Sequence, residues 1–147
     1  MPDILAIVLT IYRDEIVAKI IHTMIRVLDL DRSLSFYQQA FGLRPSHQLD
    51  FEDFALVYLR NDENDMEIEL TLNKGKTKEY KHGNGYGHVA MCVDELDDEH
   101  ERLTALGIEP TDIVEFAPDN NLLARFFFVT DPDGYEIEVL QRHGHYQ

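Results

Sequence analysis

The alternation of apolar and polar residues near the start of this chain predicts a strand followed by a helix. Residues 20–27 are rich in β-branched side chains and alternate as expected for a strand. Asp29 or Asp31 can then cap a helix, and Gly42 can end it. The apolar residues that would face inward at helical spacing are Leu34, Tyr37, Ala40 and Phe41. Further strands are predicted at Phe54–Arg60 and Met66–Asn73, separated by a polar turn.

The second half of the chain repeats this order. A strand is predicted at His88–Val93 and a helix at Glu95–Leu106, which Gly107 can end. The helix would turn Leu96, Leu103 and Leu106 inward. The strands expected after it are Ile113–Phe116, Ala124–Val129 and Tyr135–Gln141, of which the last two are joined by an Asp-Pro-Asp-Gly turn.

This internal similarity indicates a duplicated supersecondary unit. We therefore expect an α+β fold of two βαβββ modules, whose sheets line a shared metal-binding cleft. The expected divisions are an N-terminal extension at 1–19, modules at 20–75 and 88–142, a linker at 76–87 and a tail at 143–147. Within the extension, the apolar run Ile4–Tyr12 is too short to span a bilayer and is expected to add a strand or a short helix.

A histidine opens the first strand of each half, and a glutamate lies near the end of a later strand. His22 precedes Glu69 by 47 residues, and His88 precedes Glu138 by 50 residues. Because side chains alternate across a strand, each of these residues can lie on a face that lines the cleft. Two imidazoles and two carboxylates could then hold one metal ion.

Such a set of two nitrogen and two oxygen ligands suits a divalent ion, and the ligand types alone leave Ni, Co, Mn, Fe(II) and Zn open. A bound ion would polarise a carbonyl as a Lewis acid, and a neighbouring carboxylate could move a proton. The chemistry indicated is proton abstraction next to a carbonyl. Taken singly, each of the four residues is more often structural than functional, and the argument depends on their repeat.

The chain from about residue 20 to residue 141 resembles glyoxalase I (lactoylglutathione lyase) of the vicinal oxygen chelate superfamily. The resemblance is carried by the segments IHTMIRVLDLDRSLSFY, EIELTLN, YGHVAMCVDE and VTDPDGYEIEVL. It implies isomerisation of the hemithioacetal of methylglyoxal and glutathione to S-lactoylglutathione. It also implies a homodimer whose sites take ligands from both chains, and one divalent ion per site, with Ni or Co favoured and Zn possible.

The resemblance also implies roles for individual residues. The implied metal ligands are His22, Glu69, His88 and Glu138, of which Glu138 matches the catalytic base. Arg26 and Asn73 match the positions that bind the γ-glutamyl end of glutathione.

Two segments depart from the family pattern. Asn73-Lys74-Gly75 replaces Asn-Trp-Gly, and residues 118–124 replace a Lys-Gly-Gly loop that helps to hold the glycyl end of glutathione. The use of a different thiol, or of a different carbonyl substrate, therefore remains possible. The side chains that could supply the missing positive charge are Lys74, Lys76, Lys78 and Arg125.

The composition of the chain restricts the classes of molecule that it can bind. The 28 acidic residues exceed the 13 Lys and Arg and give a net charge of −15, which argues against nucleic acid and anionic membranes and leaves a small-molecule substrate. The single Cys92 excludes an internal disulfide and favours the reducing cytoplasm.

Two other classes of function remain possible for this fold. One is a related enzyme, namely an epimerase, a thiol transferase or an extradiol dioxygenase. Family transferases and dioxygenases have no ligand at the position of Glu69, so its presence argues against both. The other is a non-catalytic binding module, which typically lacks the ligands.

Overall fold

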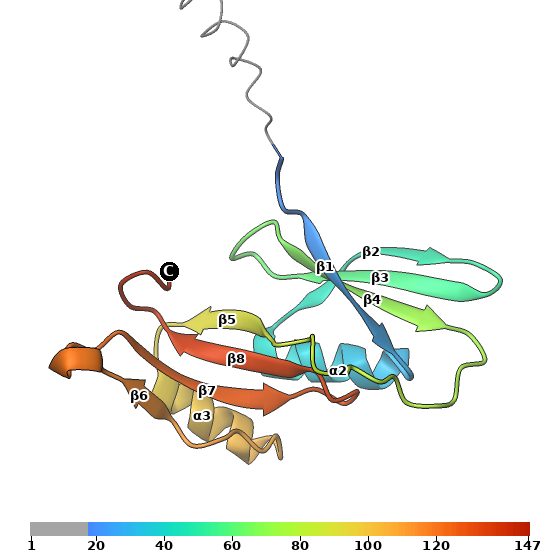
Figure 1. Ribbon diagram of the computed structural model, residues 1–147. Coiled ribbons are helices and arrows are strands. Elements are labelled where there is room, and N and C mark those ends of the chain that lie inside the picture. The colour runs from blue at the N-terminus through green and yellow to red at the C-terminus, as the bar shows by residue number, and fades with distance from the viewer. Residues whose placement is uncertain (1–17) are drawn as a thin grey trace, which may run out of the picture.

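The computed structural model describes residues 18–147, in which both helices and seven of the eight strands follow the predicted order (Figure 1). The first half contains β1 (His22–Val27), α2 (Leu30–Phe41), β2 (Arg44–Asp50), β3 (Phe54–Arg60) and β4 (Glu67–Asn73). The second half contains β5 (Val89–Val93), α3 (Leu96–Ala105), β6 (Val114–Phe116), the 3-10 helix η1 (Pro118–Asn120), β7 (Ala124–Thr130) and β8 (Glu136–Gln141). The element expected at Ile4–Tyr12 lies outside the described residues.

Each half forms its own four-stranded mixed sheet. The strand orders are β1-β4-β3-β2 and β5-β8-β7-β6. In both sheets the first strand pairs in parallel with the last, and the other neighbours are antiparallel. The predicted α+β fold of two βαβββ modules is therefore confirmed.

Two details of the predicted elements were wrong. Strand β2 was missed because all seven of its residues are exposed at a sheet edge, with a bulge after Pro45, so they show no alternation of apolar and polar positions. Leu106 does not face inward with Leu96 and Leu103, because it caps α3 and is 45% exposed.

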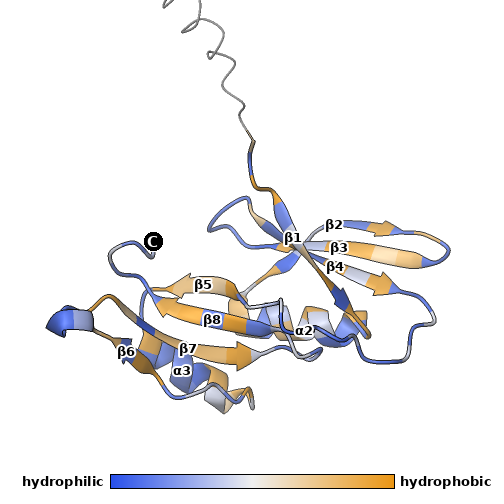
Figure 2. Cartoon of the chain, viewed as in Figure 1, coloured by the Kyte–Doolittle hydropathy of each residue, from blue (hydrophilic) through white to orange (hydrophobic). Residues whose placement is uncertain are grey.

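The two modules share one hydrophobic core. Tyr37 of α2 and Leu70 of β4 belong to the same buried cluster as Leu103 of α3 and Phe127 of β7. Figure 2 shows the hydrophobic residues concentrated on the strands, whereas η1 is hydrophilic. Within residues 18–147, no helix has the length and apolar character needed to cross a membrane.

A turn from the second module holds the N-terminal end of α2. Asp29 caps the helix by accepting a hydrogen bond from the backbone N–H of Arg32 at 3.0 Å. Asp133 crosses from the other module and accepts from the backbone N–H of Leu28 at 3.0 Å and from the Ser33 hydroxyl at 3.2 Å. Both carboxylates lie where the helix dipole favours negative charge.

Asp131, in the same turn, is a buried carboxylate that joins the modules. It accepts a hydrogen bond from the Tyr37 hydroxyl at 2.8 Å and from the backbone N–H groups of Asp133 and Tyr135 at 2.9 Å. Burial raises the pKa of Asp131, and these hydrogen bonds oppose that rise. Burial, followed by the charge of Asp131, raises the pKa of Tyr37, so its phenol stays protonated and acts as the donor.

Arg102 of α3 holds the other end of α2. Its guanidinium donates to the carbonyl of Gln39 at 2.8 Å and to that of Ala40 at 2.6 Å, and it pairs with Glu99 at 2.7 Å. These carbonyls belong to the last turn of the helix, where positive charge is favourable. The second module thus contacts both ends of α2, each with the sign of charge that the dipole prefers.

We expect Arg102→Ala to lower the free energy of unfolding by about 1–2 kcal/mol, because it leaves two helix carbonyls without their donor. Arg44→Ala is the matched control, since Arg44 makes only an exposed ion pair to Asp62 at 3.5 Å, and it should cost less than about 0.5 kcal/mol. Urea unfolding at equal protein concentration measures both. Equal costs for the two variants would contradict the role of Arg102.

Candidate functional site

The first His–Glu pair lies on the face of the first sheet that carries its polar residues. β1 and β4 run in parallel with Met24 opposite Glu69, so His22 stands two residues before the partner of Glu69. Nε2 of His22 lies 3.1 Å from Oε2 of Glu69. The Glu69 side chain is 11% exposed and the His22 side chain 33%, so the carboxylate is held inside and the imidazole opens outward.

The second pair repeats this geometry on the second sheet. β5 and β8 are also parallel, with Ala90 opposite Glu138, so His88 again stands two residues before the partner of its glutamate. Nε2 of His88 lies 3.1 Å from Oε2 of Glu138, the same distance as in the first pair. The structure therefore brings His22 beside Glu69 and His88 beside Glu138, one such contact on each sheet.

An aromatic ring supports each histidine from the strand beyond the glutamate. Tyr58 lies opposite Glu69 in the register of β3 and β4, and its ring meets that of His22 edge-on at 5.5 Å and 73°. Phe128 lies opposite Glu138 in the register of β7 and β8, and it meets His88 at 5.5 Å and 72°. The duplication therefore extends to the residues around the pairs.

The two carboxylates differ in their hydrogen bonding. Glu69 accepts from the Thr71 hydroxyl at 3.1 Å, and Tyr58 lies opposite it on β3. Desolvation, followed by the neighbouring Glu69 carboxylate, raises the pKa of Tyr58, so the phenol stays protonated and able to donate. Phe128 has no hydroxyl, and within residues 18–147 only His88 pairs with the Glu138 carboxylate.

Tyr58 is a functional candidate that the sequence reasoning missed. The internal repeat could have found it, because Tyr58 precedes Glu69 by 11 residues and Phe128 precedes Glu138 by 10. The first module has the phenol of Tyr58 where the second has the phenyl ring of Phe128. This difference is the signal that the two carboxylates have different surroundings.

The four predicted ligands do not meet within one chain. Among residues 18–147, no three His, Cys, Asp or Glu side chains are grouped closely enough to hold a metal ion. The two pairs belong to separate sheets, in each of which the first strand, β1 or β5, is an edge strand of the described fold. Each chain therefore carries two separate His–Glu pairs, each with one imidazole nitrogen and one carboxylate oxygen.

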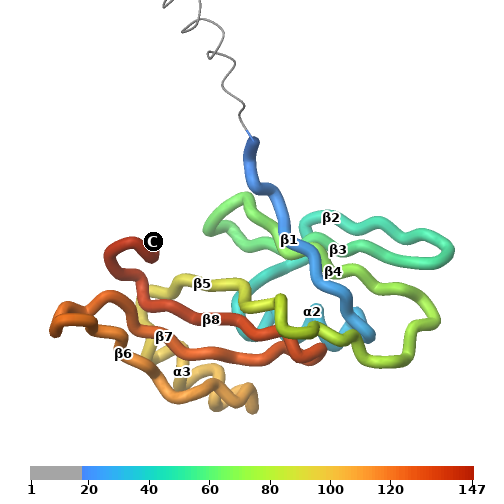
Figure 3. The backbone as a smooth tube through the Cα atoms, viewed as in Figure 1, coloured from blue at the N-terminus to red at the C-terminus, as the bar shows by residue number. Residues whose placement is uncertain are grey.

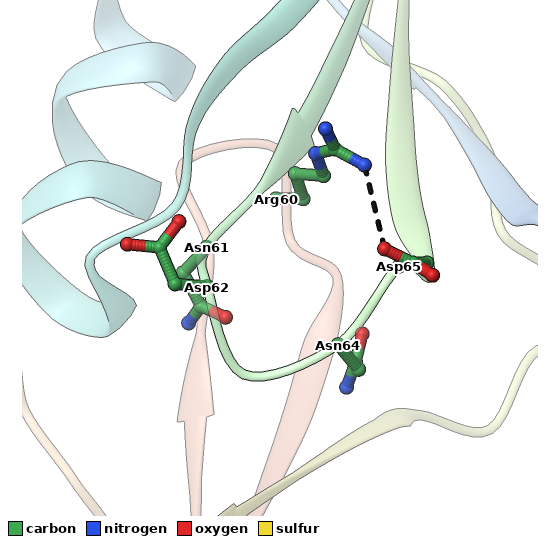
Figure 4. A pocket seen from close by; sticks show the side chains of 5 residues that line it. All are labelled: Arg60, Asn61, Asp62, Asn64 and Asp65. Atoms are coloured by element: carbon green, nitrogen blue, oxygen red, sulfur yellow. Dashed lines mark ion pairs between the residues drawn. The ribbon is translucent and has the colours of Figure 1, made fainter.

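Two surface hollows lie elsewhere. A shallow one at the turn between β3 and β4 is formed by residues 60–65, with Arg60 and Asp65 paired at 3.7 Å (Figure 4). A larger one of about 970 Å³ lies between the end of α2 and the free edge of β5. None of the four predicted ligands lines either hollow.

Arg26 and Asn73 lie on the same face as the first pair, near the ends of β1 and β4. Arg26 is opposite Thr71, two residues beyond the register of Glu69. The Tyr135 hydroxyl donates to the backbone carbonyl of Arg26 at 3.0 Å and accepts from its N–H at 3.3 Å. The Asn73 side chain donates to the Tyr80 hydroxyl at 2.9 Å.

Four cations were expected to supply the positive charge that the departures from the family pattern remove. In the described part of the chain, two of them form ion pairs and two do not. Arg125 lies on the helix-covered face of β7, where it pairs with Asp97 at 2.9 Å and Glu115 at 3.1 Å. Lys74 pairs with Asp50 at 2.7 Å. Lys76 and Lys78 make no ion pair among the described residues.

Comparison with known proteins identifies the family. Residues 19–139 match the model of the Glyoxalase/Bleomycin resistance protein/Dioxygenase superfamily. The lactoylglutathione lyase of Haemophilus influenzae is 41% identical over 128 residues, which cover 84% of this chain and 92% of that protein. The corresponding enzyme of Neisseria meningitidis is 37% identical, with coverage of 84% and 91%.

Solved structures of glyoxalase I from other organisms superpose on this chain. The trypanothione-dependent glyoxalase I of Leishmania major superposes with a TM-score of 0.71 at 35% identity, covering 85% of this chain and 87% of that one. Glyoxalase I of Zea mays gives a TM-score of 0.75 at 28% identity and covers 86% of this chain and 45% of the maize chain. With its paired modules and repeated His–Glu geometry, this chain belongs to the Glyoxalase/Bleomycin resistance protein/Dioxygenase superfamily.

Proposed function

We propose that this protein is a lactoylglutathione lyase, a glyoxalase I that isomerises the hemithioacetal of methylglyoxal and glutathione to S-lactoylglutathione. The observation that carries the proposal is the pair of matching His–Glu contacts, each at 3.1 Å on repeat-related strands. Relatives bearing this name are 37–41% identical over 84% of the chain. A fourth ligand candidate, Glu69, supports this reaction over those of three-ligand members of the superfamily.

The donor set of the two pairs fits a divalent metal ion. Imidazole nitrogens and carboxylate oxygens suit Ni, Co or Zn, and the resemblance to glyoxalase I favours Ni or Co. When bound, the ion stabilises the negative charge that develops on the substrate oxygens. His22, Glu69, His88 and Glu138 are the side chains that would hold it.

A homodimer would complete the site. Because each chain carries one half-site per module, a twofold axis can bring the first pair of one protomer to the second pair of its partner and make two equal sites. Met24, Leu49 and Phe54 are between 36% and 39% exposed on the face that carries Glu69, as expected for apolar residues that a second copy covers.

Glu138 is the stronger candidate for the catalytic base. A base needs a carboxylate lone pair that is free to accept the substrate proton, whereas Glu69 accepts from the Thr71 hydroxyl and has the protonated Tyr58 phenol as a neighbour. Glu138 has no such donors in the described part of the chain. In the proposed reaction it removes the proton from the carbon that bears sulfur and returns it to the neighbouring carbon, so no oxidant or second substrate is required.

Arg26 and Asn73 would bind the γ-glutamyl end of glutathione. Their backbone positions follow from β1 and β4, and the link from Arg26 to Tyr135 ties that strand end to the second module. We place the reaction in the cytoplasm, where a single free Cys92 and a thiol substrate both stay reduced.

The proposed activity can be tested by following thioester formation from preformed methylglyoxal–glutathione adduct, on metal-free protein titrated with Ni, Co and Zn. We expect activity to return with at least one metal. Glu138→Gln should lower the kcat of the metal-saturated enzyme by about 100-fold or more, because the base is lost. Its repeat-matched control Glu69→Gln should lower kcat less at saturating metal. Inactivity with all three metals would refute the function, and a fully active Glu138→Gln would refute the role of Glu138.

The different surroundings of the two carboxylates generate a second prediction. Tyr58→Phe should weaken metal binding by about tenfold, because a ligand carboxylate loses the donor that orients it. Phe128→Tyr is the reciprocal change, and its new hydroxyl should occupy the Glu138 lone pair and lower kcat. Competition with a chelator measures the first effect, and turnover at saturating metal the second. Unchanged metal affinity in Tyr58→Phe would contradict the role of that phenol.

A further inference from the structure

Within residues 18–147, the cations without an ion pair belong to two neighbouring parts of the first module, the end of β1 and the segment after β4. Between residues 18 and 147, all but four of the Lys and Arg side chains pair with a carboxylate. The four without an ion pair are Arg26, Lys76, Lys78 and Lys81. Arg26 lies near the end of β1, and the three lysines follow β4. Glu79 is the only carboxylate in the segment 74–87 that contains them.

These cations lie at one end of the face that carries the first half-site. Because β1 and β4 are parallel, their ends meet at the same edge of the sheet. Arg26 is two residues beyond the register of Glu69, which is about 7 Å along the strand. Figure 3 shows the segment after β4 turning back past the end of β1 on its way to β5.

Aromatic contacts hold this segment against the strand ends. The Tyr80 hydroxyl accepts from Asn73 at 2.9 Å, and Nζ of Lys76 lies 4.9 Å from the centre of the Tyr80 ring. His82 stacks on Tyr135 at 4.1 Å and 14°. Tyr135 in turn bonds the backbone of Arg26, so the lysine segment and Arg26 are tied to common neighbours.

The segment that replaces the family's Lys-Gly-Gly loop offers no such charge. Residues 116–123 carry Asp119 and no Lys or Arg, and their exposed side chains include Phe116, Leu122 and Leu123. In a chain of net charge −15, an anionic substrate is repelled over most of the surface and attracted only where cations lack partners.

We propose that Lys76, Lys78 and Lys81, together with Arg26, bind the carboxylates of the thiol half of the substrate. The inference rests on the proposed function and assigns the specificity of the same site to an acidic thiol with two carboxylates. Arg26 and Asn73 hold the first carboxylate, and the three lysines attract and hold the second. The lysine segment thereby takes over the contact that residues 118–124 no longer supply.

The test measures binding apart from turnover. S-Methylglutathione, an unreactive thioether that keeps both carboxylates, is titrated into metal-loaded protein by calorimetry. The variant Lys76→Gln/Lys78→Gln/Lys81→Gln should bind about tenfold more weakly and show a smaller dependence of Kd on salt. The control Lys19→Gln/Arg44→Gln/Arg60→Gln removes the same charge from residues whose cations are paired, and it should bind as the wild type does.

Two further arms make the outcome decisive. Replacing the same three lysines by arginine should restore wild-type affinity, because the charge returns. The glycine amide of S-methylglutathione should bind wild type and the glutamine variant equally, because it lacks the second carboxylate. Wild-type affinity of the glutamine variant for S-methylglutathione, or an equal loss in the control variant, overturns the proposal. Inactivity of the wild-type enzyme would instead count against the proposed function. The binding of S-methylglutathione would still test this inference, because it does not depend on turnover.

Discussion

The attachment of helix α2 to the second module is the constraint on which the rest of the structure depends. Asp133, in the turn before β8, lies at its N-terminal end, Asp131 of the same turn accepts from Tyr37, and the guanidinium of Arg102 lies at its C-terminal end. Each interaction satisfies a backbone or hydroxyl group that would otherwise be left unpaired, and the charges of Asp133 and Arg102 match the sign of the helix dipole. The same turn carries Tyr135, which bonds the backbone of Arg26 near the end of β1, so one contact region orients both the helix and the strand that carries His22.

The duplicated fold provides symmetric positions, and small differences between the copies provide the chemistry. The two His–Glu distances and the two His–aromatic geometries are nearly the same. One hydroxyl distinguishes Tyr58 from Phe128, and it lies against a carboxylate. The proposed metal centre would use this difference, because one glutamate would stay a ligand while the other exchanges a proton.

The cations of the chain also differ in their surroundings. Most of those in the described residues form ion pairs, and some of these pairs join separate elements, as Arg125 joins β7 to α3 and β6. Within residues 18–147, the cations without an ion pair are Arg26, near the end of β1, and three lysines in the segment after β4. The excess of acidic residues makes that location distinctive, because an anion finds few other favourable approaches.

Local patterns along the chain were enough to predict the repeated modules, both helices and seven of the strands, because alternation and caps act over a few residues. They could not reveal β2, whose exposed residues owe their conformation to hydrogen bonds with β3. They also could not show that Arg125 faces Asp97, that Tyr58 reaches Glu69, or that the two pairs stay on separate sheets. Those facts depend on how strands pair and how the modules pack against α2, which are contacts between residues far apart in the sequence.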